Sequence, residues 1–204
     1  IVTLLVVLSA VIIASPTSVF SAASHIVISE IQISDTVAND EFVELYNPTN
    51  DTIDLTGWKL KRKTASSSTE TNLASSISGS IVPHGFFLLA HPSYDGSAPA
   101  DMQYTSSASG IAANNTVLLR DSGNTLIDKV GMGVAQDNET ASTSVPGDGE
   151  SIERKANSLS TDTSMNTGGA DETAGNGEDT DNNSADFILK AVSQPHNAQS
   201  AIDH

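Results

Sequence analysis

The chain has 204 residues and a formal net charge of −16 at pH 7, and 38% of its residues are hydrophobic but only 4% aromatic. This length suits one domain with appendages, whose modest core must be built from aliphatic side chains. The acidic balance argues against broad nucleic-acid binding, which requires a basic footprint. The absence of cysteine excludes disulfides, thiolate zinc sites, cysteine nucleophiles and a lipoprotein anchor among these residues.

The chain begins with an almost wholly apolar run, IVTLLVVLSAVIIA, and small residues follow at Ser21, Ala22 and Ala23. This order is typical of the hydrophobic region and cleavage zone of a secretory signal peptide, whose basic n-region we expect further upstream. A retained anchor is the alternative, although a membrane span needs about 20 apolar residues. We therefore expect residues 1–23 to be a signal peptide or an anchor. Both interpretations place the following residues outside the cytosol, secreted or at the cell surface.

The next part of the chain predicts strands. Residues 25–34, HIVISEIQIS, begin with apolar side chains on both faces, as a strand buried on both sides does. The stretch 40–60, DEFVELYNPTNDTIDLTGWKL, follows a polar loop and predicts a strand, a turn rich in Asn, Pro and Asp, and a second strand. In the first of these strands Val43 and Leu45 share one face, and Glu44 lies on the other.

The second strand of this hairpin carries the only tryptophan of the chain. Trp58 and Leu60 lie two residues apart and share one face of a strand, which makes Trp58 the predicted anchor of the core. The KLKRK run that follows Trp58 is cationic at every position except Leu60. Lys59, Lys61 and Lys63 are either a patch that binds phosphates or anionic lipid heads, or the solvent face of an edge strand, where lysine discourages edge pairing.

The middle of the chain predicts three further strands. FFLLA at 86–90 follows a Pro-His-Gly turn, and segments 116–121 and 125–130 flank Ser-Gly-Asn, which is a hairpin signal. His84 and His91 stand near the two ends of FFLLA, but no third ligand stands at a recognised spacing. They are therefore predicted to be surface turn histidines rather than a metal pair.

The last third of the chain combines strands with a polar segment. GESIERK at 149–155 predicts a strand in which Arg154 is either exposed or buried beside an interior carboxylate. Residues 156–184 hold almost no large apolar side chain, so we expect an acidic, low-complexity loop that is partly disordered. ADFILK at 185–190 is predicted to close the sheet, and residues 198–204 form a C-terminal tail.

Several motifs in this order resemble the lamin-tail domain family: ISEI, EFVELYNP, DLTGWKL, the Pro-His-Gly turn before FFLLA, and GESIER. The resemblance covers about residues 26–197 and implies an all-β, immunoglobulin-like β-sandwich. It departs from the family pattern near its end, where SQPHN stands in place of a Ser-Pro-Gly motif. There Gln194 separates Ser from Pro, and His196 occupies a position where the family often has Gly.

The candidate metal site is the segment DTDNNSAD at 179–186. Oxygen-bearing side chains recur along it at Asp179, Asp181, Asn183 and Asp186. Such oxygens suit Ca²⁺, and D-x-D-x-N resembles the opening of a calcium loop. An EF-hand is excluded because Ser184 and Lys190 stand where that loop needs Gly and Glu. A weak calcium site, with a dissociation constant of roughly 0.1–1 mM, and a helix-free turn rich in Asn and Asp both remain open.

No catalytic motif stands out: the chain lacks G-x-S-x-G, H-E-x-x-H, P-loop and G-x-G-x-x-G patterns. Carboxylate pairs occur at Glu41/Glu44 and Glu150/Glu153, but a sugar-binding cleft has few aromatic residues to be made from. As the resemblance implies, the prediction is a secreted or surface-associated, non-catalytic module that binds a protein, a surface polymer or a membrane component through an edge strand or long loops.

Two alternatives to this function stay open. One is a calcium-dependent adhesion or structural module that uses the acidic loop, with Ca²⁺ as its cofactor. The other is an accessory module of a secreted nuclease or hydrolase. No nucleic-acid partner is expected, and membrane contact is expected only through an uncleaved N-terminal segment.

Overall fold

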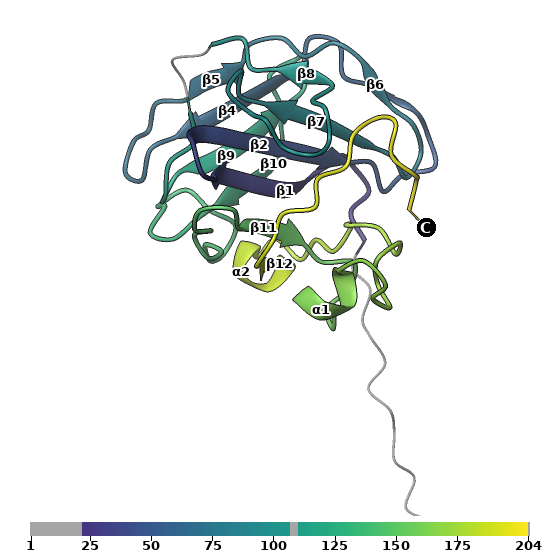
Figure 1. Ribbon diagram of the computed structural model, residues 1–204. Helices are drawn as coiled ribbons and strands as arrows, with labels where there is room; N and C mark the ends of the chain where they lie inside the picture. The colour runs from purple at the N-terminus through teal and green to yellow at the C-terminus, as the bar shows by residue number, and fades with distance from the viewer. Residues whose placement is uncertain (1–21, 107–109, 204) are drawn as a thin grey trace, which may run out of the picture.

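The computed structural model describes residues 22–106 and 110–203, which form twelve strands and two single-turn helices (Figure 1). Most of the predicted signal peptide or anchor, residues 1–21, lies outside the described residues. Within the described ranges, no helix has the length and apolar character that crossing a membrane requires.

The strands form two main sheets and one short pair. The larger sheet consists, in spatial order, of β12 (Phe187–Lys190), β11 (Ser151–Arg154), β1 (Val27–Ser34), β2 (Ala38–Tyr46), β7 (Phe86–Ala90) and β8 (Met102–Gln103). The smaller sheet consists of β10 (Leu126–Gly131), β9 (Thr116–Arg120), β4 (Lys59–Lys63) and β5 (Thr71–Ala74). β3 (Ile53–Asp54) pairs with β6 (Ser80–Ile81). The pairing of β7 with β8 is parallel, and the other strand pairs are antiparallel.

An aliphatic core fills the space between the two sheets. Val43 and Leu45 of β2 pack in it together with Leu60 of β4 and Leu119 of β9, and all four side chains are fully buried. The core-facing residues alternate with residues of the opposite face, as the two-residue period of a strand requires. This arrangement is an immunoglobulin-like β-sandwich, which confirms the predicted fold class.

The predicted hairpin over residues 40–60 is wrong, because β2 and β4 belong to different sheets. The turn after β2 is fixed by Asn47, whose side-chain amide donates to the carbonyls of Asp51, Ile81 and Val82. These bonds direct the chain out of the larger sheet and across to the smaller one. Trp58 is only partly buried at the rim of the core, so Leu60 is the deeper anchor of this stretch.

The interpretation of KLKRK as an edge strand is also wrong. β4 lies between β9 and β5 in the smaller sheet. Two of its half-buried lysines pair with carboxylates: the ammonium group of Lys61 lies 3.0 Å from Glu70, and Lys63 pairs with Asp137. A central strand therefore tolerates these cations because neighbouring acids neutralise them.

Local patterns elsewhere predicted the structure well. β9 and β10 form the expected antiparallel hairpin, and β7 has the predicted bounds. His91 contradicts its prediction as a surface residue, since it is 3% exposed and its Nδ1 accepts a hydrogen bond from the backbone of Ser93. His84 lies in the predicted turn, with a φ of 56°.

The acidic segment 156–184 follows a defined path in the structure and contains α1 (Asp162–Met165). Hydrogen bonds to side chains stabilise it in place of apolar burial. Thr161 caps α1, and the Asn176 amide donates to Glu153 and to the carbonyl of Arg154. The helix-free turn considered for residues 179–186 is wrong, because α2 (Asn183–Asp186) forms one helical turn immediately before β12.

Candidate functional site

Three glutamates lie side by side on the outer face of the larger sheet. The strand register places Glu30 of β1 opposite Glu153 of β11 on one side and opposite Glu44 of β2 on the other. Their neighbours Ile31, Val43 and Ile152 point into the core, so alternation turns the glutamates to the opposite face. All three glutamates are nonetheless buried, with exposed fractions of 1%, 6% and 1% for Glu30, Glu153 and Glu44. We call these three residues the Glu30 cluster.

Most carboxylate oxygens of the Glu30 cluster accept hydrogen bonds from nearby groups. Glu44 accepts one from the Ser29 hydroxyl at 2.6 Å. Glu30 accepts one from the Ser151 hydroxyl through Oε1, whereas its buried Oε2 has no hydrogen-bond partner among the described residues. Glu153 Oε2 lies 3.1 Å from the ammonium group of Lys190, which is itself fully buried. The nearby hydrogen-bond donors and cations therefore do not fully compensate the negative charge of three ionised carboxylates.

This imbalance raises the pKa of two of the glutamates. Burial, followed by the charges of Glu153 and Glu44, raises the pKa of Glu30 well above its usual range. Burial also raises the pKa of Glu153, although the charge of Lys190 acts in the opposite direction. Burial between two further carboxylates therefore favours the protonated, neutral form of Glu30 over the ionised one.

A C-terminal segment, residues 193–203, crosses the sheet over this cluster (yellow in Figure 1) and turns at residues 197–200, where the N–H of Ser200 donates to the carbonyl of Asn197. The backbone N–H of Gln194 donates to Glu30, that of His196 donates to Glu44, and that of Ala198 donates to Asp101. The far end of the segment is fixed by the N–H of Asp203, which donates to the carbonyl of His84 at 3.0 Å.

His196 makes two side-chain contacts under this segment. Its ring stacks on Phe86 with centroids 4.6 Å apart, and its Nδ1 lies 3.4 Å from a Glu44 oxygen. Burial lowers the pKa of His196, but the hydrogen bond and charge of Glu44 outweigh that effect, together with the charges of Asp203 and Glu30. The net result is a pKa of about 9. The imidazole is therefore a cation at neutral pH.

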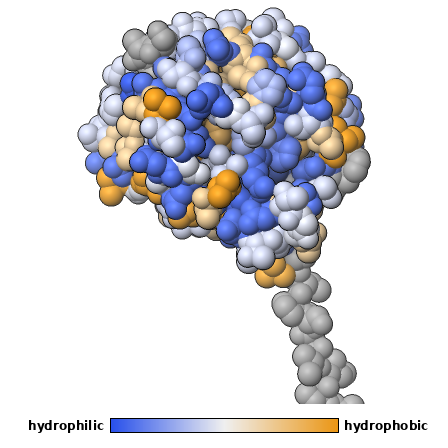
Figure 2. Space-filling view, viewed as in Figure 1, coloured by the Kyte–Doolittle hydropathy of each residue, from blue (hydrophilic) through white to orange (hydrophobic). Residues whose placement is uncertain are grey.

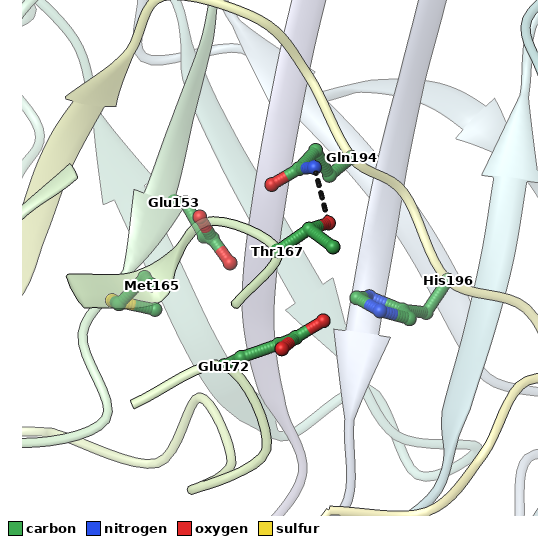
Figure 3. Close-up of a pocket in the computed structure, with 6 residues that line it drawn as sticks. All are labelled: Glu153, Met165, Thr167, Glu172, Gln194 and His196. Carbon is green, nitrogen blue, oxygen red and sulfur yellow. Dashed lines mark hydrogen bonds between the residues drawn. The ribbon is translucent and has the colours of Figure 1, made fainter. Parts of the chain in front are cut away.

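A small cavity of about 50 Å³ lies beside His196 (Figure 3). Its lining residues come from β11, the acidic segment and the C-terminal segment: Glu153, Met165, Thr167, Glu172, Gln194 and His196. The Gln194 amide donates to the Thr167 hydroxyl at 3.1 Å, and the side chain of Glu172 extends towards the His196 ring. Pockets for small-molecule ligands typically enclose about 300–1,000 Å³. This cavity fits a few waters or the end of one side chain.

A second buried acidic group surrounds Arg154, on the core side of β11. The guanidinium lies 2.9 Å from Asp128, 3.3 Å from Asp179 and 4.0 Å from Asp186, and it stacks over the Phe187 ring at 4.7 Å. Its Nε donates to the carbonyl of Ile28. We call these four charged residues the Arg154 cluster. Arg154 is fully buried and paired with carboxylates, which is the buried alternative left open by the sequence.

The four predicted calcium ligands divide between different environments. Asp179 and Asp186 face Arg154, so its guanidinium occupies the position between them that a calcium ion would need. Asn183 Oδ1 accepts from the N–H groups of Gly131 and Glu139, and Asp181 is exposed with a φ of 55°. Among the described residues, no three His, Asp or Glu side chains converge as metal ligands do. Calcium binding here stays a prediction, and it requires these side chains to rearrange.

The predicted anion-binding lysines are partly neutralised. Lys61 pairs with Glu70, and Lys63 shares Asp137 with Lys129, whereas Lys59 is half-buried beside them. Arg120 also pairs with Glu70. An anion approaching this strand would compete with two carboxylates already in place, so an anion-binding patch here stays a prediction.

The sequence contained a signal for the Glu30 cluster that its interpretation missed. In the motifs ISEI, EFVEL and SIER, the residues Glu30, Glu44 and Glu153 each stand next to an apolar residue that faces the core. Alternation alone therefore places all three on the outer face. Their proximity depends on the strand order β11-β1-β2, which no local pattern gives.

The fold and site define a β-sandwich module whose buried carboxylates are covered by its own chain. The sequence model of the Lamin Tail Domain family matches residues 20–133, and the chain belongs to this family. Glu30 and Glu44 lie within the matched range, whereas Glu153 and His196 lie beyond it.

A separate search of curated proteins found no matching sequence. Among solved structures, a DUF4876 family protein from Bacteroides thetaiotaomicron resembles this chain with a TM-score of 0.55 and 14% sequence identity. The similarity covers 83% of this chain and 71% of that one. At this identity the likeness supports the fold alone.

Proposed function

We propose that this chain is a non-catalytic binding module that acts outside the cytosol, secreted or at the cell surface, and that its partner is a protein with a cationic surface. The observation that carries the proposal is the state of the Glu30 cluster. Its acids, which an enzyme would need to present to substrate, are buried beneath residues 193–203 and accept hydrogen bonds from their own chain. The cavity beside them, about 50 Å³, is too small for a sugar or a nucleotide.

The distribution of charge supports a cationic partner. Six of the nine Lys and Arg side chains form ion pairs within the molecule: Lys61, Lys63, Arg120, Lys129, Arg154 and Lys190. Since the formal net charge is −16, the remaining acids dominate the surface. Figure 2 shows a largely hydrophilic face with hydrophobic residues scattered over it. Such a field attracts cationic surfaces and repels nucleic acid. The apolar run at residues 1–14 supports the extracytoplasmic location.

One test measures catalysis directly. The purified chain is incubated with model phosphodiester, ester and glycoside substrates, with and without divalent metal ions, beside a Glu30→Gln/Glu153→Gln variant. We expect no turnover above that of the variant, because the acids are covered. Turnover that the double substitution abolishes overturns the non-catalytic assignment.

A second test measures binding. The immobilised chain is presented with purified basic and acidic proteins of similar size at 0.15 M salt, where the Debye length is about 8 Å. Saturable binding to basic proteins that weakens with added salt supports the proposal. Binding to acidic proteins alone, or to none, contradicts it.

A further inference from the structure

We infer that the groove beneath residues 193–203 is a binding site for an extended, cationic peptide segment of a partner protein, and that the C-terminal segment is its intramolecular occupant. This inference rests on the proposed function and names the partner of one surface. Its support comes from three features: a row of side-chain carboxylates that accept hydrogen bonds from backbone N–H groups, an aromatic platform, and an acidic cavity that the present occupant leaves open.

The row of acceptors recognises an extended backbone. The N–H groups of residues 194, 196 and 198 donate to carboxylates of Glu30, Glu44 and Asp101, which project from β1, β2 and the connection before β8. Alternate N–H groups of an extended chain point the same way, so an extended peptide presents the donors of residues 194 and 196, whereas Ala198 donates from the turn at residues 197–200. Such main-chain contacts supply affinity without dictating side chains, as in other modes of strand recognition. Pro195 lacks an N–H and the N–H of Asn197 donates to the Ser200 hydroxyl within the segment, so neither intervening residue bonds the groove through its N–H.

The aromatic platform selects a flat cation. Phe86 stacks on the His196 ring at an interplanar angle of 24°, and Glu44 lies at the ring edge. A planar cation between an aromatic face and a carboxylate gains both stacking and charge attraction. Imidazolium and guanidinium groups meet this description, whereas the ammonium group of lysine lacks the planar face.

The acidic cavity selects a second cation in the ligand, two residues before the position of His196. Gln194 stands at its mouth, bonds Thr167 and leaves the cavity unfilled (Figure 3). Glu153 lines this cavity, is 6% exposed, and its Oε2 has no hydrogen-bond partner among the described residues, although Lys190 lies 3.1 Å away. Glu172 forms another wall.

The charge around the groove is unbalanced in favour of a cationic ligand. Two cations, Lys190 and His196, stand among four acids besides the buried Glu30: Glu44, Glu153, Asp162 and Glu172. A neutral glutamine at the cavity is therefore a poorer match than an arginine or lysine, whose longer side chain would reach the acids. The best ligand carries Arg or Lys at the position of Gln194 and a flat cation two residues later.

The tethered occupant is partly exposed, although Asn197 and Asp203 are buried, so a partner segment must compete with its bonds to replace it. Residues 193–196 are only half-buried, and Ala198, Gln199 and Ile202 are exposed. A tethered segment competes with an effective concentration in about the millimolar range. A partner must therefore match the groove better than residues 193–203 do, and the open cavity provides the means.

The test measures fluorescence anisotropy of labelled peptides with the full chain and with a His196→Ala chain, whose own segment is loosened. The first peptide has the sequence of residues 192–201, and the second carries Gln194→Arg. We expect the Gln194→Arg peptide to bind the His196→Ala chain at least tenfold more tightly than the first peptide. Glu172→Gln in the protein should remove most of that gain and leave the first peptide unaffected. N-methylation of the peptide at the position of His196 should weaken binding at least tenfold.

Several outcomes would overturn the inference. These are equal affinities of the two peptides, equal binding of a scrambled peptide with the same charge, or no binding by a His196→Ala chain that still melts cooperatively. If that variant does not fold, the full chain with Gln194→Arg provides an independent measurement: its melting temperature should rise and its peptide binding should fall, and no change in either contradicts the site. Loss of peptide binding with retained binding of basic proteins defeats this inference alone, whereas enzymatic turnover defeats the proposed function.

Discussion

Glu153 and Arg154 are neighbours on β11, yet they belong to two buried acidic clusters on opposite faces of the larger sheet. In the Arg154 cluster, three aspartates surround a guanidinium that also donates to the carbonyls of Ile28 and Glu178. In the Glu30 cluster, the carboxylates face one another, and the raised pKa values of Glu30 and Glu153 favour their protonated, neutral forms. One strand therefore neutralises buried acid in two ways.

The difference teaches where this sandwich is fixed and where it responds to its surroundings. A guanidinium stays charged at every pH at which the protein folds and presents several donors in a fixed geometry. It joins the two sheets, because Arg154 lies on β11 and Asp128 on β10. Protons exchange with the solvent, so the Glu30 cluster and the segment above it depend on pH. Rigidity is therefore concentrated on the inner face, and dependence on pH on the outer face.

The largest expected effect comes from removing the guanidinium. Arg154→Met should destabilise the protein by about 3–5 kcal/mol, because it leaves Asp128 and Asp186 buried without a cation. Denaturant unfolding measures this loss. Lys155→Met is the matched control on the next residue, where the ammonium donates only to an exposed carbonyl, and it should change stability by less than about 0.5 kcal/mol. A loss below about 1 kcal/mol for Arg154→Met would show that the cluster does not hold the sheets together.

The second prediction concerns pH. Burial raises the pKa of Glu41 to about 8 and that of Glu139 to about 8, and the pKa of His196 is about 9. In each case the folded state binds its proton more tightly than the unfolded state, so stability falls as pH rises between about 4.5 and 9. Because one pKa unit corresponds to about 1.4 kcal/mol, we expect a loss of about 2 kcal/mol or more from pH 5 to pH 9.

Thermal melts across this range measure the slope. Glu30→Gln should flatten it, since the amide needs no proton to be neutral, and Glu150→Gln, at a half-buried position outside the cluster, is the control. At the acid end the sign reverses: the hydrogen bond from Arg120 lowers the pKa of Glu70 to about 2, and its contribution is lost as pH falls below about 4.5. A melting temperature that rises from pH 5 to pH 9 would contradict the raised pKa values of these buried groups.

The sequence predicted those features that depend on neighbouring residues. The β9–β10 hairpin followed from turn formers between two apolar runs, and the faces of β2 followed from alternation. The crossing after β2 was missed because Asn47 bonds carbonyls as far away as Ile81 and Val82, and the same turn residues also suit a hairpin.

The candidate site was harder to predict for the same reason. Alternation places each glutamate of the Glu30 cluster on the outer face, but strand order brings them together. The position of residues 193–203 over the cluster depends on hydrogen bonds between residues far apart in the sequence. Gln194 and Glu30 are 164 residues apart, and His196 and Glu44 are 152 apart. The sequence showed His196 only as a departure from a family motif.

The third prediction asks whether the acidic turn beside the Arg154 cluster accepts a further cation. Asp179 and Asp186 must leave Arg154 to bind calcium, so we expect a dissociation constant near the weak end of about 0.1–1 mM. At 10 mM calcium this corresponds to about 1.4 kcal/mol of stabilisation, measured as a chelator-sensitive rise in melting temperature. Asp181→Asn should reduce the rise. Magnesium at the same concentration is the control, and no shift with calcium removes the calcium-dependent alternative.

The smallest effect is expected at the cover of the Glu30 cluster. His196→Ala removes the stacking on Phe86 and the ion pair with Glu44, but residues 193–203 keep their backbone bonds to Glu30 and Asp101. Because the imidazole is partly exposed, global stability should fall by only about 1 kcal/mol or less.

Hydrogen exchange resolves the effect locally. The amides of residues 194, 196 and 198 should exchange faster in the variant, while those of β1 and β2 stay protected. Asn197→Ala, which removes a bond to the carbonyl of Pro99, tests whether any loosening of the segment has the same result. If His196→Ala also exposes β1 and β2, the segment is part of the sandwich rather than a cover over it, and the contrast between a fixed inner face and an adjustable outer face fails.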